Sequence, residues 1–88
     1  MNGALPITIA EWPRSKKEML RVRLDQFKGV NTIDVRSWYI NESTGAVCPG
    51  RSGITLAVSH LENLASSLAR AVQVANERGI IGNDGGES

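Results

Sequence analysis

The stretch MLRVRLDQFKGVNTIDVRSWYI, residues 19–40, decides the fold of this chain. In its first half Leu20, Val22 and Leu24 alternate with two arginines and an aspartate. A period of two with one apolar side predicts a half-buried antiparallel strand. The second half, TIDVRSWYI, is a β-branched and aromatic run with the same period. Gly29 lies between the two runs and suits a tight turn, so the stretch predicts a β-hairpin.

The second strand of this hairpin leaves one assignment open. Strict alternation puts Trp38 on the same side as Arg36, and Tyr39 on the same side as Val35. A β-bulge would exchange the two rings, because one extra residue reverses the alternation that follows it.

Shorter strands are predicted on both sides of the hairpin. AVCPG and SGITLA, which begin at Ala46 and Ser52, are expected as two short strands separated by a bend. Before the hairpin, ITIAEW at residues 7–12 is a possible edge strand that ends at Pro13. A basic loop, PRSKKE, follows it.

The clearest element is a helix of about 19 residues near the C-terminus. Ser59 and Glu62 match a capping box, and Gly79 suits the position after the last turn. An apolar stripe at three- and four-residue steps is predicted to supply core and dimer contacts; it comprises Leu61, Leu64, Leu68 and Val72. Strands followed by one helix, without βαβ alternation, indicate an α+β fold with an antiparallel sheet.

Size and composition limit how the domain is stabilised. The chain has 88 residues, which predicts one domain near the lower limit for a self-sufficient core. It has one cysteine and one histidine, so neither an intrachain disulfide nor a zinc cluster is expected. Oligomerisation is the remaining route. No apolar segment is long enough to span a membrane and no signal peptide is evident, so an intracellular protein is expected.

The charge is unevenly distributed. The net charge is +1, but residues 14–51 hold eight Lys/Arg against four acids. Such a basic half favours a polyanionic partner. Catalytic chemistry has little support, because His60 and Cys48 lack partners at a useful spacing and no phosphate-binding loop is present. The chain is therefore expected to be no enzyme and to need no cofactor or metal.

Aromatic side chains are interleaved with this basic charge. Phe27, Trp38 and Tyr39 are three of the four aromatic residues in the chain. Cations that follow a phosphate backbone, with rings that stack on bases, are the requirements of single-strand binding. The predicted phosphate contacts are Arg21, Arg23, Lys28, Arg36 and Arg51. The alternatives are core positions for the rings and a mixed-charge solvated face for the arginines. Asp25 and Asp34 share strand faces with arginines, so charge pairing is expected for them rather than a metal site or an acid/base dyad.

Several short motifs occur together in an order typical of one family. They are FKG at 27–29, IDVR at 33–36 before an aromatic pair, PGR at 49–51 and GITL at 53–56, followed by one helix. In this order and spacing the chain resembles the transcriptional coactivator called positive cofactor four, together with its bacterial and phage relatives. The resemblance covers roughly residues 19–78.

The resemblance implies a protomer with a curved four-stranded antiparallel sheet and one C-terminal helix. It implies a homodimer, formed through the helix and the last strand, that binds single-stranded DNA without sequence preference. Family roles would fall on Phe27, Lys28, Arg36, the Trp38–Tyr39 pair and Arg51. The expected domains are an extension at 1–18, the binding and dimerisation domain at 19–79 and a flexible tail at 80–88.

The chain also departs from the family pattern. Ser52 stands where a lysine is common, and the order of Trp38 and Tyr39 is reversed relative to the eukaryotic members. A compact bacterial or phage form, acting in the cytoplasm or nucleoid in transcription, replication, recombination or repair, is expected. Two alternatives stay open: an adaptor that contacts polymerase or replication proteins, and a duplex-DNA regulator. The absence of a helix-turn-helix pattern disfavours the second.

Overall fold

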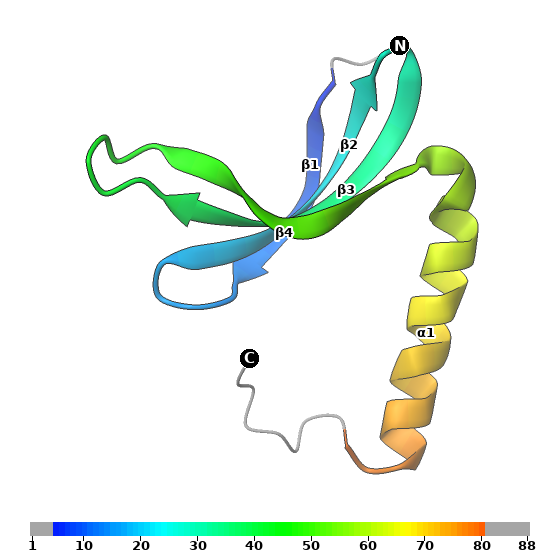
Figure 1. The fold of residues 1–88 in the computed structure, drawn as a ribbon. Coiled ribbons are helices and arrows are strands. Elements are labelled where there is room, and N and C mark those ends of the chain that lie inside the picture. Colours follow the sequence, from blue (N-terminus) through cyan, green and yellow to red (C-terminus); the bar gives the residue numbers. More distant parts are fainter. Residues whose placement is uncertain (1–4, 81–88) are drawn as a thin grey trace. The chain divides into compact units, whose positions relative to one another are not determined.

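The computed structural model describes residues 5–80, which form four strands and one long helix (Figure 1). The elements in chain order are β1 (Ile7–Pro13), β2 (Glu18–Phe27), β3 (Val30–Ile40), β4 (Val47–Ala57), a 3₁₀ turn (Val58–His60) and α1 (Leu61–Glu77). The predicted α+β class, an antiparallel sheet followed by one helix, is confirmed. The chain divides after Val58 into a sheet unit and a helix unit, which are described separately. Most of the predicted tail lies outside the described residues.

The sheet is a meander in which each strand pairs with its neighbour in sequence. The strand order is β1-β2-β3-β4 and every pair is antiparallel. The long strands bend strongly along their length, so the sheet is curved (Figure 1). The possible edge strand is confirmed as β1, which pairs with β2 from Ile7↔Leu24 to Pro13↔Met19. The central strands are therefore β2 and β3, which come from the hairpin predicted by residues 19–40.

The turn of this hairpin is the two-residue loop Lys28–Gly29. Phe27 pairs with Val30 across it, and the φ angles of Lys28 and Gly29 are 52° and 81°. Positive φ at both loop residues is what a type I′ turn requires, and its twist matches that of the flanking strands. The predicted turn at Gly29 is confirmed, and it presents Lys28 at the tip of the hairpin.

The prediction of two short strands after the hairpin was wrong. Val47–Ala57 is one continuous strand, β4. Between the pairs Arg36↔Gly53 and Trp38↔Pro49, β4 advances four residues while β3 advances two. The bend that the proline and glycines suggested is therefore a β-bulge inside one strand, and pairing resumes beyond it.

Gly53 permits this close contact between β4 and β3. A Cβ atom at position 53 would lie 2.7 Å from the carbonyl oxygen of Val35 and 2.8 Å from both Cα and Cβ of Arg36. A Cβ at Gly50 would lie 3.0 Å from the carbonyl oxygen of Ser37. Both glycines of β4 thus lie where an added Cβ would press against the backbone of β3.

We expect Gly53→Ala to destabilise the protein, because backbone atoms of β3 cannot move aside as a flexible side chain can. Overpacking of this kind costs roughly 1–3 kcal/mol in the free energy of unfolding. Urea denaturation measures the change, and Ser52→Ala, at the neighbouring exposed position, is the matched control. Equal stability of the two variants would contradict the steric explanation.

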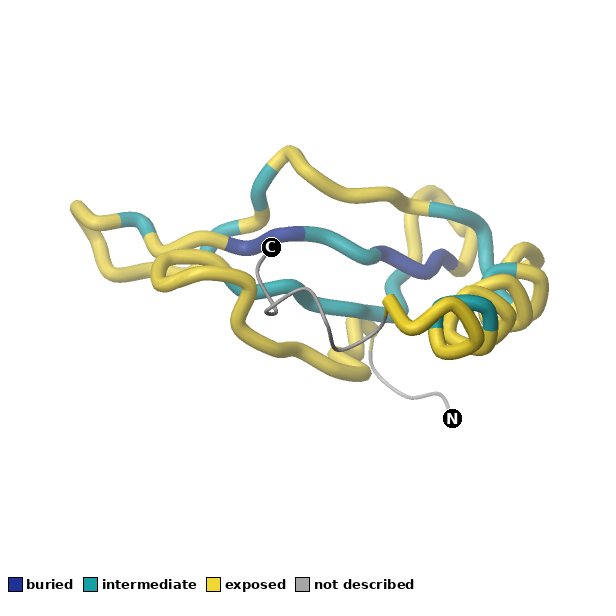
Figure 2. The backbone as a smooth tube through the Cα atoms, turned by 90° about the horizontal axis from the view of Figure 1, so that it is seen from below, coloured by how far each residue is buried: buried dark blue, intermediate teal, exposed yellow. Residues whose placement is uncertain are grey.

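Buried residues of the sheet unit are concentrated in β3. They form two short segments of that strand (Figure 2) and comprise Thr32, Ile33, Asp34, Ser37 and Trp38. One side of the sheet carries Leu20, Val22 and Leu24, which are half-buried, and Ile54, which is exposed. The described chain thus keeps a large part of its apolar surface in contact with solvent.

The sequence predicted the C-terminal end of α1 correctly but not the capping of its N-terminal end. Its N-cap is His60 and no side-chain cap forms, so the predicted capping box was wrong: the 3₁₀ turn places Ser59 ahead of the cap position. At the other end, the amide of Gly79 (φ 71°) donates to the carbonyl of Asn76, and that of Ile80 donates to Ala75. These two bonds form a Schellman motif, which confirms the expected role of Gly79.

The apolar stripe of α1 is only partly covered. Leu61 and Leu64 are half-buried, whereas Leu68 and Val72 are exposed. Within residues 5–80, no helix combines the length and the apolar character needed to cross a membrane.

Candidate nucleic-acid interface

Three of the predicted arginines share one side of the sheet. Arg21 pairs with Arg36 across β2 and β3, and Arg23 pairs with Asp34. Directly opposed residues project to the same side. We call this side the arginine face; it carries Glu11, Arg21, Arg23, Asp25, Phe27, Asp34, Arg36 and Trp38.

Trp38 lies on the arginine face under two guanidinium groups. The Cζ atoms of Arg21 and Arg23 are 4.2 and 5.0 Å from the centroid of its ring, in cation–π geometry. The residue is only 8% exposed. Its Nε1, like the Nε of Arg23, has no hydrogen-bond partner among the described residues. The ring is therefore a platform for the arginines in this structure.

Tyr39 lies on the opposite side of the sheet. It pairs with Glu18 on β2 and with Cys48 on β4, and it is exposed. The bulge lies in β4 and the register of β3 with β2 is regular, so β3 keeps its strict alternation and the two rings are not exchanged. The structure thus brings Trp38 together with the arginines and separates Tyr39 from them.

Each of the three arginines is paired with a carboxylate of the same face. Nε of Arg21 is 2.8 Å from Oε1 of Glu11, Nη2 of Arg23 is 2.9 Å from Oδ2 of Asp25, and Nη2 of Arg36 is 3.0 Å from Oδ1 of Asp34. The charge pairing expected for Asp25 and Asp34 is confirmed. Within each pair the positive and the negative charge cancel, so these six residues together carry no net formal charge.

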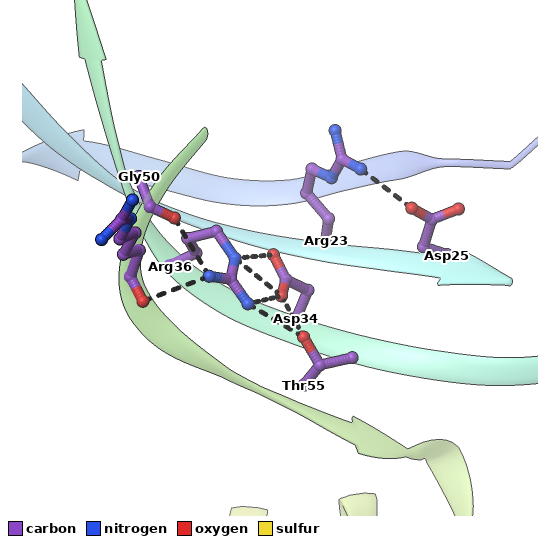
Figure 3. A network of polar contacts seen from close by, with 7 residues as sticks. Arg23, Asp25, Asp34, Arg36, Gly50 and Thr55 are labelled. Carbon is purple, nitrogen blue, oxygen red and sulfur yellow. Dashed lines mark hydrogen bonds and ion pairs between the residues drawn. The ribbon is translucent and has the colours of Figure 1, made fainter. Parts of the chain in front are cut away.

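Arg36 makes a larger network than the other two (Figure 3). Its Nη1 donates to the carbonyl of Gly50 at 3.1 Å, and its Nη2 donates to Oγ1 of Thr55 at 3.0 Å. The Thr55 hydroxyl donates in turn to Oδ1 of Asp34 at 2.6 Å. These bonds join β3 to Gly50 inside the bulge of β4 and to Thr55 just beyond it. Arg36 therefore holds the segment that carries Arg51.

We expect Arg36→Lys to lower the free energy of unfolding by about 1–3 kcal/mol, because an ammonium group cannot reproduce the planar set of donors and leaves part-buried acceptors unpaired. Chemical denaturation measures this change. Arg51→Lys, the same substitution at an exposed position, should be nearly neutral. An Arg36→Lys variant as stable as Arg51→Lys would contradict the structural role.

Two cations and one ring are displayed more openly. Arg51 is exposed on the bulge, and within residues 5–80 its side chain forms no ion pair. Lys28 occupies the hairpin tip with its Nζ 5.3 Å from the centroid of the Phe27 ring. Phe27 itself is 65% exposed, the most open aromatic side chain among those described. These three residues are available to a ligand without rearrangement of the sheet.

Two shallow recesses flank Trp38, and its side chain lines both. One, of about 260 Å³, lies among Arg23, Phe27, Arg36 and Thr55. The other, of about 270 Å³, is lined by residues that the sequence analysis did not select; they include Trp12, Lys16, Lys17 and Met19. The basic residues of the loop at 14–17 could have suggested this recess. The sequence around the loop, however, does not show that the loop lies next to Trp38 in the fold. Among the described residues no cluster of His, Cys, Asp and Glu could hold a metal ion.

Comparison with known proteins identifies the family of this chain. Residues 14–67, more than half of the chain, match the family model described as Transcriptional Coactivator p15 (PC4). The chain therefore belongs to this family, and the resemblance found in the sequence is confirmed. The RNA polymerase II transcriptional coactivator SUB1 of Saccharomyces cerevisiae is 47% identical over 36 residues, which are 41% of this chain and 12% of that protein. The chain thus spans a small part of this curated relative.

Solved structures show the same architecture. A PC4 homologue from Burkholderia pseudomallei, in its tetragonal crystal form, superposes with a TM-score of 0.66 and 25% identity, over 77% of this chain and 98% of that one. A bacteriophage T5 homologue of the eukaryotic coactivator PC4, implicated in recombination-dependent DNA replication, has a TM-score of 0.63 and 18% identity, over 86% of this chain and 83% of that one. The second likeness concerns the fold alone.

Proposed function

We propose that this protein binds single-stranded DNA without sequence preference, as a homodimer and without catalytic activity. The observation that carries the proposal is the open Phe27 ring beside Lys28 and the arginine face. The family membership and the described relatives favour a role in transcription or in recombination-linked replication. The setting would be the cytoplasm or nucleoid of a bacterial cell, or of a host cell if the gene belongs to a phage.

Each displayed group suits an unpaired strand. Base stacking on an aromatic ring contributes about 1–3 kcal/mol and accepts any base, which explains binding without sequence preference. Lys28 and Arg51 offer uncompensated charge to phosphates at the hairpin tip and at the bulge. In this proposal Phe27 stacks on bases, whereas Trp38 acts beneath Arg21 and Arg23.

The dimer is proposed from exposed apolar surface. Ile54 on β4 and both Leu68 and Val72 on α1 are exposed. A chain of this size buries few apolar side chains, so leaving these exposed lowers the stability of a single copy. Exposed apolar side chains on the last strand and on the helix suit an interface between two copies.

A competition experiment tests the binding mode. We expect an unlabelled single strand to displace a labelled one far better than a duplex of equal length, at low and at moderate salt. Phe27→Ala should weaken binding about 5- to 150-fold, which corresponds to the loss of one base stack. Tyr39→Ala is the matched control, because that ring lies on the other side of the sheet.

Equal competition by duplex DNA would favour a duplex-DNA regulator instead. If Phe27→Ala binds as tightly as the native protein, the stacking role is wrong. Specific retention of polymerase or replication proteins, together with negligible DNA affinity, would support the adaptor alternative.

The dimer has its own test. We expect light scattering after gel filtration to give twice the chain mass of 9.5 kDa for the native protein. The double substitution Leu68→Glu and Val72→Glu should yield monomer, because each added charge would have to be buried at the interface. Ser67→Glu, at an exposed helical position outside the apolar stripe, is the control. A monomeric native protein at micromolar concentration would contradict the proposed dimer.

A further inference from the structure

We propose that Glu11 and Asp25 compete with nucleic-acid phosphate for Arg21 and Arg23, and thereby set the affinity of the arginine face. The inference rests on the proposed function and adds affinity-determining residues to it. It also gives the edge strand β1, which supplies Glu11, a part in binding.

The two arginine side chains are less exposed than their carboxylate partners. The side chains of Arg21 and Arg23 are 18% and 19% exposed and lie over the Trp38 ring. The side chains of Glu11 and Asp25 are 45% and 35% exposed. A carboxylate can therefore turn into solvent while the guanidinium stays on its aromatic platform. A phosphate oxygen can then take the vacated position without any movement of the sheet.

The third pair behaves differently. The side chain of Asp34 is 12% exposed, and it accepts hydrogen bonds from both Arg36 and Thr55. Release of Asp34 would leave a buried carboxylate unpaired, which costs far more than the opening of an exposed pair. Exchange is thus confined to Arg21 and Arg23, and Arg36 keeps its structural role.

The exchange has a recognisable electrostatic consequence. A displaced carboxylate stays beside the arriving phosphate, so the like charges repel and the freed carboxylate attracts a cation from solution. This uptake offsets part of the counterion release that drives binding to DNA. Both effects weaken binding in the native protein, and both disappear when the carboxylate is replaced by its amide.

The test uses a fluorescent oligothymidylate and the full chain in a series of salt concentrations. We expect Glu11→Gln and Asp25→Asn each to bind about two- to tenfold more tightly than the native protein, since exposed pairs are individually weak. The slope of log K against log[salt] should steepen by up to about one. Asparagine at 25 keeps an oxygen for the amide of Gln26, which donates to Oδ1 of Asp25 at 2.8 Å.

Glu18→Gln is the matched control for net charge. It removes the same charge from the same sheet, but Glu18 pairs with Tyr39 on the opposite side. If this control gains as much affinity as Glu11→Gln, the effect is one of overall charge and the proposal is overturned.

A double-mutant cycle separates competition from simple repulsion. We expect Glu11→Gln to give a clearly smaller gain when Arg21 is already replaced by Gln, because the repulsion between Glu11 and phosphate remains but no guanidinium is left to release. A full gain in that background would mean that Glu11 only repels phosphate, which overturns the proposal.

Failure of this inference is distinguishable from failure of the proposed function. If the native protein binds the oligonucleotide but Glu11→Gln and Asp25→Asn leave its affinity unchanged, only the competition is wrong. If neither the native protein nor any variant binds, the single-strand function itself is wrong and the inference is overturned with it. Circular dichroism of each variant confirms that the fold is retained.

Discussion

The close contact of β4 with β3, fastened by Arg36, is the constraint on which the rest of the sheet unit depends. Gly53 lets the two backbones approach, and the guanidinium then spans the bulge from Gly50 to Thr55. Asp34 neutralises that guanidinium inside the sheet. Because a bulge alone would leave carbonyl groups unpaired, the arginine makes the bend stable and gives Arg51 a defined position.

On the arginine face, positive groups that can attract a polyanion are each paired with a carboxylate. Three guanidinium groups lie side by side without mutual repulsion because each has a carboxylate neighbour. Trp38 gives Arg21 and Arg23 a surface to rest on, so their positions do not depend on the carboxylates alone. The same side chains can thus stabilise the free sheet and still present charge to a polyanion, since replacing one partner of an exposed ion pair costs little free energy.

The exposed apolar surface of the described chain is what the proposed homodimer would cover. A sheet with few buried residues, and a helix with an exposed stripe, make little core within one copy. In the proposed dimer this surface becomes core, and two arginine faces are held in one particle. Dimerisation would then supply stability to the fold and a second binding surface to its function.

The sequence by itself determined the β2–β3 hairpin, its turn at Gly29 and the final helix, because alternation, glycine and helical periodicity are local signals. The order of its short motifs gave the resemblance to the family, which the family model confirmed. Alternation also placed Arg36 and Trp38 on one side. The sequence did not determine that β4 is one bulged strand, that no bulge in β3 exchanges Trp38 with Tyr39, or that Trp38 lies beneath two arginines. Those features depend on register and on contacts between strands distant in sequence. Which arginine is structural and which is exchangeable was likewise decided by the tertiary structure, because burial of the partner carboxylate sets the cost of releasing it.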